Sequence, residues 1–260
     1  MKSMISICIS LLMVGSIVTV GQSAGMDLAG AWLFDEGSGG ETKDSVGGND
    51  GEIQGDLKWV DGKFGKGLEF PGRGDSYVSI PHEDVLDSDP YTITAWTKLK
   101  NTGNYQYIAW QNGLVWPEPH AKRHTDIWVM NQPGNVVIMW SFEGGAAYGR
   151  IDGKTIVADD TWHHVAKSSD GDMMRLFIDG KLDGEAAVGG KLIVNGEDPL
   201  WIGARPGDVA ATGIFDEVGF FTKALSEDEL EEVMNEGLAV IAAVEPSGKL
   251  STTWGELRSE

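Results

Sequence analysis

Cysteine and basic residues are scarce in this 260-residue sequence, and each shortage excludes a class of protein. The single cysteine, Cys8, has no second cysteine to pair with, so a hydrophobic core, aided by a bound metal such as calcium, must replace disulfides. The 20 Lys and Arg are dispersed among 40 Asp and Glu, giving a formal charge of −20. Phosphate-binding faces need clustered Lys and Arg, which excludes nucleic acid and anionic membranes as expected partners.

Motifs of common hydrolases are absent as well. After residue 25 the sequence contains no GxSxG nucleophile elbow; the string GQSAG at residues 21–25 ends the apolar N-terminal segment. The sequence also contains no HExxH zinc motif and no phosphate-binding glycine loop. Glycoside hydrolysis needs two carboxylates about 5–10 Å apart. The acidic run SEDELEE falls on a predicted helix, however, and strand alternation should place Asp216 and Glu217 on opposite faces. These absences predict a protein that is not an enzyme.

The N-terminal segment has the layout of a secretory signal peptide. Lys2 precedes an apolar run over residues 4–20, and small residues follow at 23–25. We expect residues 1–24 to be cleaved, leaving a secreted, periplasmic or cell-surface protein with no membrane contact. A retained anchor is the alternative, because about seventeen apolar residues is marginal for a membrane span.

Short apolar or alternating runs recur along the rest of the chain, separated by Gly, Asp, Asn and Pro. Eleven runs have this form, among them YTITAWTKL, NVVIMWSF and GIFDEVGFF. Their regular spacing indicates an antiparallel β sandwich or jelly roll rather than a fold of alternating strands and helices. We therefore predict one all-β domain over residues 25–225.

One short helix is predicted after this domain, over residues 226–237. Ser226 and Glu229 have the spacing of a capping box, and Gly237 is a suitable C-cap. Residues 238–260 are expected to form a C-terminal tail, in which the apolar residues 239–244 favour docking on the domain.

The stretch DDTWHHVAKSSDGDMMRLFIDGKLD resembles a reactive cluster but is predicted to be a hairpin. Alternation sends Trp162 and His164 to one strand face and His163 to the other, so the two histidines are poorly placed to share a metal. The remaining acids fall mainly in turns, at residues 169–172 and at Asp179.

A succession of motifs carries a family resemblance. In order, these are AWLFDEGSG, DSVGGNDGEI, VDGKFGKGLEF, SYVSIP, YTITAWTK, WHHVAKSSDGDMMRLFIDGK, PLWIGA and GIFDEVGFFTKALSEDEL. Over roughly residues 27–235, the chain resembles the laminin-G-like members of the concanavalin A-like lectin/glucanase superfamily. The resemblance implies a jelly roll of two antiparallel sheets, one of them concave. Such proteins include sugar-binding modules, adhesion domains and glycoside hydrolases, but the paired-carboxylate strand motifs of the hydrolases are missing here.

The resemblance also implies a calcium ion that ties the start of the domain to its last strand. Asp35 and Asp216 occupy the matching ends, and Asp44, Asn49 and Asp75 lie in glycine-rich loops that could bend around an ion. The alternative interpretation is that these side chains cap turns or pair with Lys and Arg.

A second candidate site lies in the central segment, residues 104–131, where aromatic and polar side chains suit a glycan. The predicted ligand-binding residues are Trp116, His120, Arg123, His124 and Tyr107. Trp116 is favoured because it lies in a loop stiffened by two prolines.

Other interpretations of the same segment carry less weight. Trp110, Trp128 and Trp140 are expected to be sandwich core more often than ligand platform. Zinc binding by His120 and His124 is disfavoured, because the prolines between residues 116 and 120 argue against a helix.

We therefore expect an exported, calcium-stabilised, non-catalytic module that binds carbohydrate or another extracellular ligand. The alternatives are a structural or adhesive surface protein with a protein partner, and a polysaccharide hydrolase or lyase that would use His120, His124, Arg123 and Tyr148.

Overall fold

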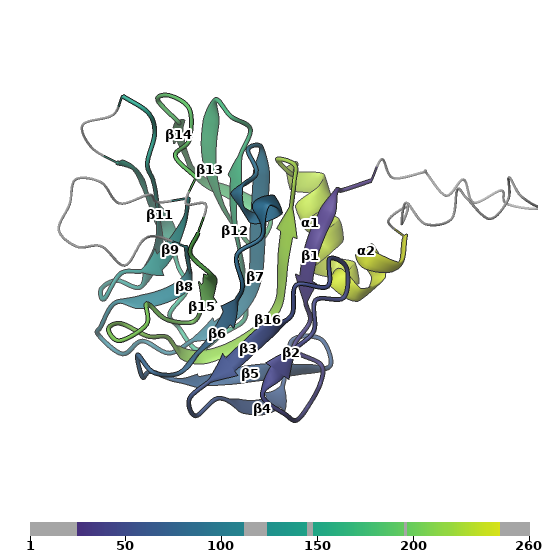
Figure 1. Cartoon of the computed structure of the whole chain (residues 1–260). Coiled ribbons are helices and arrows are strands. Elements are labelled where there is room, and N and C mark those ends of the chain that lie inside the picture. The colour runs from purple at the N-terminus through teal and green to yellow at the C-terminus, as the bar shows by residue number, and fades with distance from the viewer. Residues whose placement is uncertain (1–24, 112–123, 145–147, 195–196, 245–260) are drawn as a thin grey trace, which may run out of the picture.

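A computed structural model describes residues 25–111, 124–144, 148–194 and 197–244. Within these ranges the chain forms two antiparallel sheets that pack face to face (Figure 1). Sheet A has the order β14 (Lys181–Ala187), β13 (Met173–Ile178), β12 (His163–Ser169), β7 (Tyr91–Leu99), β16 (Thr212–Phe221), β5 (Lys66–Pro71) and β4 (Lys58–Asp61), with β1 (Leu28–Trp32) also paired to β16. Sheet B has the order β11 (Gly149–Ile156), β10 (Asn135–Trp140), β9 (Thr125–Val129), β8 (Gln106–Gln111), β15 (Leu200–Ile202), β6 (Tyr77–Ile80), β3 (Gly51–Gln54) and β2 (Glu41–Thr42).

This architecture confirms the predicted all-β sandwich, and all eleven predicted runs contain strands. The main core lies between the sheets and takes alternate residues from both, such as Leu68 and Phe70 of β5 in sheet A and Ile138 and Trp140 of β10 in sheet B. One short 3₁₀ helix, η1 (Asp84–Asp87), connects β6 to β7 and buries Leu86.

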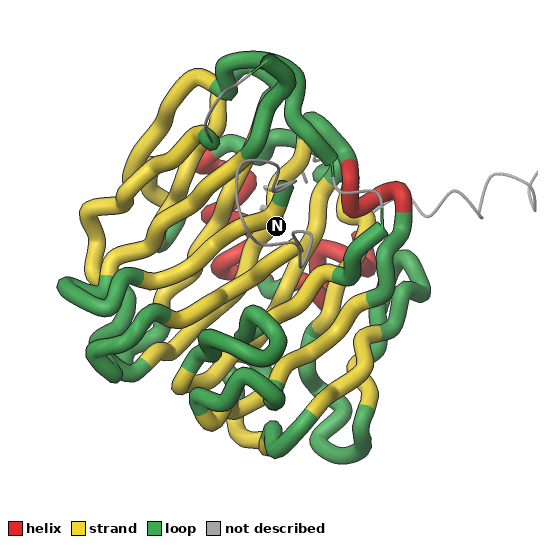
Figure 2. Tube along the Cα trace, turned by 60° about the vertical axis from the view of Figure 1, so that its left-hand side comes forward, coloured by secondary structure: helices red, strands yellow, loops and turns green. Residues whose placement is uncertain are grey.

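Two short helices cover part of the outer side of sheet A, beside β1 and β16 (Figures 1 and 2). The first, α1 (Glu227–Glu236), begins at the predicted capping box. The Ser226 hydroxyl accepts a hydrogen bond from the Glu229 amide, and the Glu229 carboxylate accepts one from the Ser226 amide. The helix ends at Gly237, as expected.

The second helix, α2 (Leu238–Val244), occupies the start of the segment predicted to be a tail. Leu238 and Ile241 are buried against the sheet, so this part of the tail docks. Residues 245–260 and the expected signal peptide, residues 1–24, lie outside the described residues. Among the helices that the structure describes, none is long and apolar enough to span a membrane.

A lysine is buried between the two sheets. Lys167 of β12 is 0% exposed, and its amine donates hydrogen bonds to the carbonyl oxygens of His124 (2.5 Å) and Met139 (2.8 Å). Burial lowers the pKa of Lys167 to about 7, although the negative charge of Asp126 opposes the shift. The amine thus links β12 of sheet A to the backbone of sheet B.

We expect Ser226→Ala to lower the free energy of unfolding by about 1 kcal/mol, because one N-cap hydrogen bond is lost. Urea denaturation measures this change. Ser226→Thr is the matched control, since it keeps the hydroxyl; equal stability of the alanine variant and the wild type would contradict the role of the cap.

We also expect Lys167→Met to change how stability depends on pH. The unfolded lysine holds its proton up to about pH 10, whereas the folded one releases it above about pH 7. The unfolded state therefore binds more protons between these values, so Lys167 makes stability rise with pH across this window. Denaturation of both proteins at pH 7, 8.5 and 10 should show that the variant lacks this increment; parallel curves would contradict the buried, neutral amine.

Candidate ligand-binding site

A row of side chains crosses the outer face of sheet B. Paired residues on neighbouring antiparallel strands share a face, so the strand register identifies the row. Its members, from β3 to β11, are Glu52, Ser79, Trp201, Trp110, Asp126, Met139 and Arg150. Aromatic side chains thus occupy the centre of the face, and polar or charged ones lie toward both ends.

A β-bulge in β8 adds Tyr107 to this face. Tyr107 and Trp110 are three residues apart, a separation that would place them on opposite faces of a regular strand. The register shifts between Tyr107 and Ala109, which restores both rings to the outer side. Trp110 stacks on Trp201 with ring centroids 5.1 Å apart, and Tyr107 meets Trp110 edge-on at 6.1 Å.

The rings differ in accessibility along the face. Trp110 and Trp201 are 4% and 7% exposed, so they support the surface rather than form it. Trp128 of β9 is half-buried, and Tyr105 packs edge-on against it at 5.3 Å while remaining 44% exposed. The accessible aromatic surface is therefore at the β9–β11 end of the sheet.

Arg150 lies over the ring of the half-buried Trp128. The guanidinium carbon of Arg150 is 5.3 Å from the centroid of the Trp128 ring. Its Nε and Nη2 atoms donate to the two carboxylate oxygens of Asp152, at 2.8 Å and 2.5 Å. This pair raises the pKa of Arg150 and lowers that of Asp152, so both groups stay charged and hold each other in place.

The structure brings only part of the predicted ligand set to this face. Tyr107 lies on it, whereas Trp116, His120 and Arg123 lie outside the described residues. His124 corrects the prediction: it is 0% exposed, its Nε2 atom is 3.0 Å from the carbonyl oxygen of Ser88, and burial lowers its pKa to about 4. A neutral, enclosed imidazole of this kind is a packing residue.

The three tryptophans expected to lie in the core occupy two different places. Trp140 lies in the core between the sheets, as expected. Trp110 is also buried, but in a separate hydrophobic cluster on the outer face of sheet B, against which the half-buried Trp128 packs. No pattern in the sequence indicates the β-bulge in β8. The bulge changes the face of the sheet on which Trp110 lies relative to Tyr107.

The predicted metal ligands lie in three places. Asp44 accepts hydrogen bonds from the amides of Ala31, Val46 and Asn49, so it organises the loop after β1. Asp75 pairs with Arg73. Both contacts match the alternative interpretation of turn capping and ion pairing.

Asp35 and Asp216 lie together, at the turn between β4 and β5. Asp35 accepts from the Lys66 amide at 2.7 Å, while one Asp216 oxygen accepts from the amides of Lys63 and Phe64 at 2.7 and 2.9 Å. The turn thus joins the segment after β1, the first strand, to β16, the last one. Across the described residues, however, no group of three or more His, Cys, Asp or Glu is arranged to hold a metal ion.

Glu217, beside Asp216, is a buried carboxylate for which the sequence predicted no binding role. Its backbone has a φ of 51°, and the β16 register shifts between Asp216 and Gly219, so simple alternation fails here. Its side chain accepts a hydrogen bond from the amide of Leu238, at the start of α2. Burial raises the pKa of Asp216 to about 8 and that of Glu217 to about 7, and Asp35 adds to the latter shift.

The adjacent histidines on β12 are structural. His163 contacts Asp179 through Nδ1 at 2.8 Å and Asp159 through Nε2 at 3.3 Å, within the predicted hairpin. His164 is 1% exposed, packs edge-on to Trp96 at 5.2 Å and has its pKa lowered to about 4 by burial. Both lie on sheet A, away from the aromatic face.

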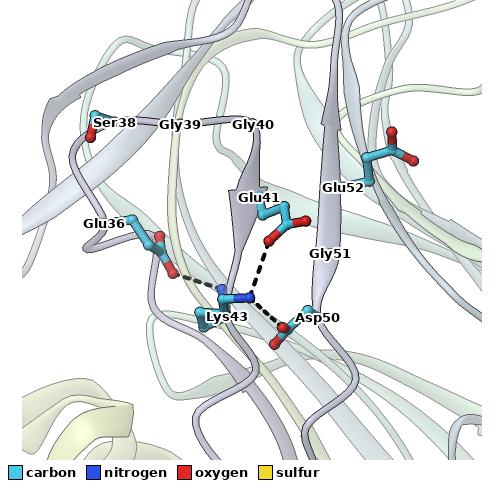
Figure 3. A pocket seen from close by; sticks show the side chains of 9 residues that line it. All are labelled: Glu36, Ser38, Gly39, Gly40, Glu41, Lys43, Asp50, Gly51 and Glu52. Carbon is cyan, nitrogen blue, oxygen red and sulfur yellow. Dashed lines mark hydrogen bonds and ion pairs between the residues drawn. The ribbon is translucent and has the colours of Figure 1, made fainter.

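A polar hollow of about 610 Å³ lies at the β2–β3 edge of sheet B (Figure 3). Lys43 is its one cation among the described lining residues, and its amine bridges Glu41 at 3.1 Å and Asp50 at 2.6 Å. Glu52, which begins the row across the sheet, also lines the hollow. The hollow therefore adjoins the end of the aromatic face that is opposite Arg150.

Comparison with known families decides the identity of the fold. The family model described as the concanavalin A-like lectin/glucanases superfamily matches residues 72–231. This chain belongs to that superfamily. The match includes all of the strands that carry the aromatic row except β3. A search of curated proteins found no match.

Solved structures share the superfamily fold at low identity. The binding domain of Paraclostridial Mosquitocidal Protein 1 has a TM-score of 0.63 and 16% identity, over 81% of this chain and 52% of that one. Domain 4 of AbnA, a GH43 extracellular arabinanase from Geobacillus stearothermophilus, solved with arabinotriose, has a TM-score of 0.60 and 20% identity, over 80% and 98%.

The binding domain of botulinum neurotoxin DC has also been solved, with SialylT and with rat synaptotagmin II. Both complexes give a TM-score of 0.60 and 12% identity, over 81% of this chain and 51% of the neurotoxin chain. This chain thus spans about half the length of the toxin domains and nearly all of the arabinanase domain.

Proposed function

We propose that this protein is an exported, non-catalytic module that binds carbohydrate through the outer face of sheet B. The observation that carries the proposal is the aromatic cluster on this face, in which Trp110, Trp201 and Tyr107 are buried, Trp128 is half-buried, and the exposed Tyr105 packs on Trp128. Aromatic planes pack on the apolar faces of sugar rings, and polar groups beside them bond the hydroxyls.

The location of the face supports a binding role. Helices cover part of the outer side of sheet A, whereas the outer face of sheet B carries the cluster of Tyr107, Trp110 and Trp201. An arabinanase domain of the same fold and nearly the same extent was solved with arabinotriose, and a neurotoxin domain with SialylT.

The placement of the carboxylates supports a non-catalytic role. The buried pair Asp216 and Glu217 has raised pKa values, which a general acid requires. Their oxygens are nevertheless bonded to backbone amides of the β4–β5 turn and α2, on sheet A. They serve to join chain segments and do not line the aromatic face.

A glycan array with the purified protein in calcium buffer tests this function. We expect binding to one group of glycans, and loss of that binding in Tyr105→Arg, because Tyr105 is the 44% exposed ring that packs edge-on against Trp128. Ser45→Arg is the matched control, since Ser45 is exposed in the loop after β1. An array without signal would favour an adhesive protein with a protein partner, the kind of complex solved for the neurotoxin domain and synaptotagmin. Release of reducing ends or unsaturated products from a polysaccharide would contradict the non-catalytic role.

We propose further that calcium stabilises the turn between β4 and β5. Asp35 and Asp216 contact this turn, and Asp35 contributes to the raised pKa of the neighbouring Glu217, which indicates that negative charges are concentrated there. Carboxylate oxygens are the hard ligands that calcium prefers, and backbone carbonyls would complete the shell. The ion would relieve the repulsion between these charges.

Isothermal titration of chelator-treated protein tests the ion, together with its melting temperature. We expect calcium to bind and to raise the melting temperature, because a ligand of the native state stabilises it. Asp35→Asn should weaken both effects, whereas Asp61→Asn, which removes an exposed partner of Lys66 at the same turn, should not. Absence of both effects in the wild type would refute the calcium proposal.

A further inference from the structure

The exposed end of the aromatic face contains a compact set of groups with the chemistry of a sugar subsite. Trp128, Arg150 and Asp152 form its centre, and Tyr105 and Tyr148 flank it with 44% and 42% exposure. Resting on the carbohydrate function proposed above, we infer that this subsite selects an uncharged sugar ring over an anionic one.

The register explains how the set assembles. Trp128 of β9 and Asp152 of β11 both pair with Val137 of β10, so they flank that residue on the same face. Arg150 lies two residues from Asp152 and extends across β10 to the Trp128 ring. Both tyrosines lie close enough to raise the pKa of the Arg150 guanidinium, after the larger effect of Asp152.

The hydrogen bonds of Arg150 leave donors for a ligand. Its Nε and Nη2 atoms are engaged with Asp152, and Nη2 also contacts the sulfur of Met130 at 3.9 Å. A guanidinium carries five N–H donors. Among the described residues, Arg150 donates only through Nε and Nη2, so its Nη1 group can donate to a ligand. The Asp152 side chain is 52% exposed, so its oxygens can accept from a hydroxyl. A sugar hydroxyl both donates and accepts, which suits this fixed pair.

Electrostatics determines the class of sugar. The charge of Arg150 is balanced by Asp152 at hydrogen-bond distance, so it offers little net attraction to an anion. The whole chain, moreover, carries a formal charge of −20. The negative charge of a uronate or sialyl group would be repelled by the net negative charge of the protein. A neutral ring has no such repulsion and keeps the favourable contact with Trp128 and Tyr105.

Titration calorimetry with two sets of soluble ligands tests the inference. The neutral set is arabinotriose, xylotriose, cellotriose and laminaritriose; the anionic set is trigalacturonic acid and a sialylated trisaccharide. We expect a neutral trisaccharide to bind, with an affinity that changes less than twofold between 50 and 500 mM NaCl, an expectation that follows from the absence of a screened charge–charge contact. Trp128→Ala and Arg150→Met should each weaken binding at least tenfold.

Arg175→Met is the matched control, because Arg175 of β13 is also paired with carboxylates, Asp170 and Glu185, but lies on sheet A. It should bind like the wild type, and circular dichroism should show that all variants are folded. Preference for the anionic set with strong salt dependence would overturn the inference and leave the carbohydrate function standing. Neutral binding that survives both Trp128→Ala and Arg150→Met would overturn the subsite alone. Failure of every sugar here and on the array would overturn both proposals.

Discussion

The two-residue alternation of strands that are packed against one core is the constraint on which the rest of the structure depends. Each central strand of sheet B gives every second side chain to the core, as Ile127 and Val129 do in β9, so the intervening residues must form the outer face. Trp128 is therefore presented outward by the same packing that buries its neighbours. This aromatic face requires no added element, because it consists of the side chains that the core does not take.

Two β-bulges interrupt the alternation, and each one changes the face to which a side chain points. In β8 the bulge places Tyr107 and Trp110 on one face and extends the aromatic cluster. In β16 the bulge turns Glu217 into a left-handed conformation, from which its carboxylate reaches the first amide of α2. Bulges of this kind re-aim side chains at a local cost in ladder hydrogen bonds.

The sequence predicted the fold well because its signals are local and strong. Strands that contribute to the core show clear apolar patterns, and the helix start at Ser226 follows from a capping box. The strands that escaped prediction, β2, β3, β4, β11 and β14, lie at or next to sheet edges, where fewer apolar residues are buried and the pattern weakens. The site was harder to predict. The burial of His124 and the position of Arg150 over the Trp128 ring depend on strands that meet only in three dimensions, and no spacing in the sequence encodes them.

Two sets of carboxylates in this structure have different surroundings. In sheet A, Asp216 and Glu217 are buried, and their carboxylates accept hydrogen bonds from backbone amides. These bonds connect β16 to the β4–β5 turn and to α2. Desolvation makes them costly, so they are kept where they stabilise long-range connections. On the outer face of sheet B, Asp152 is half exposed and held by an arginine beside an aromatic ring. A charged pair that is fixed yet solvent-accessible can exchange a water contact for a ligand hydroxyl at little cost in ordering, because the protein has already immobilised both partners. This preorganisation is what distinguishes the β9–β11 end from the acidic hollow at β2–β3, whose lysine bridges two exposed carboxylates without an aromatic plane among the lining residues that the structure describes.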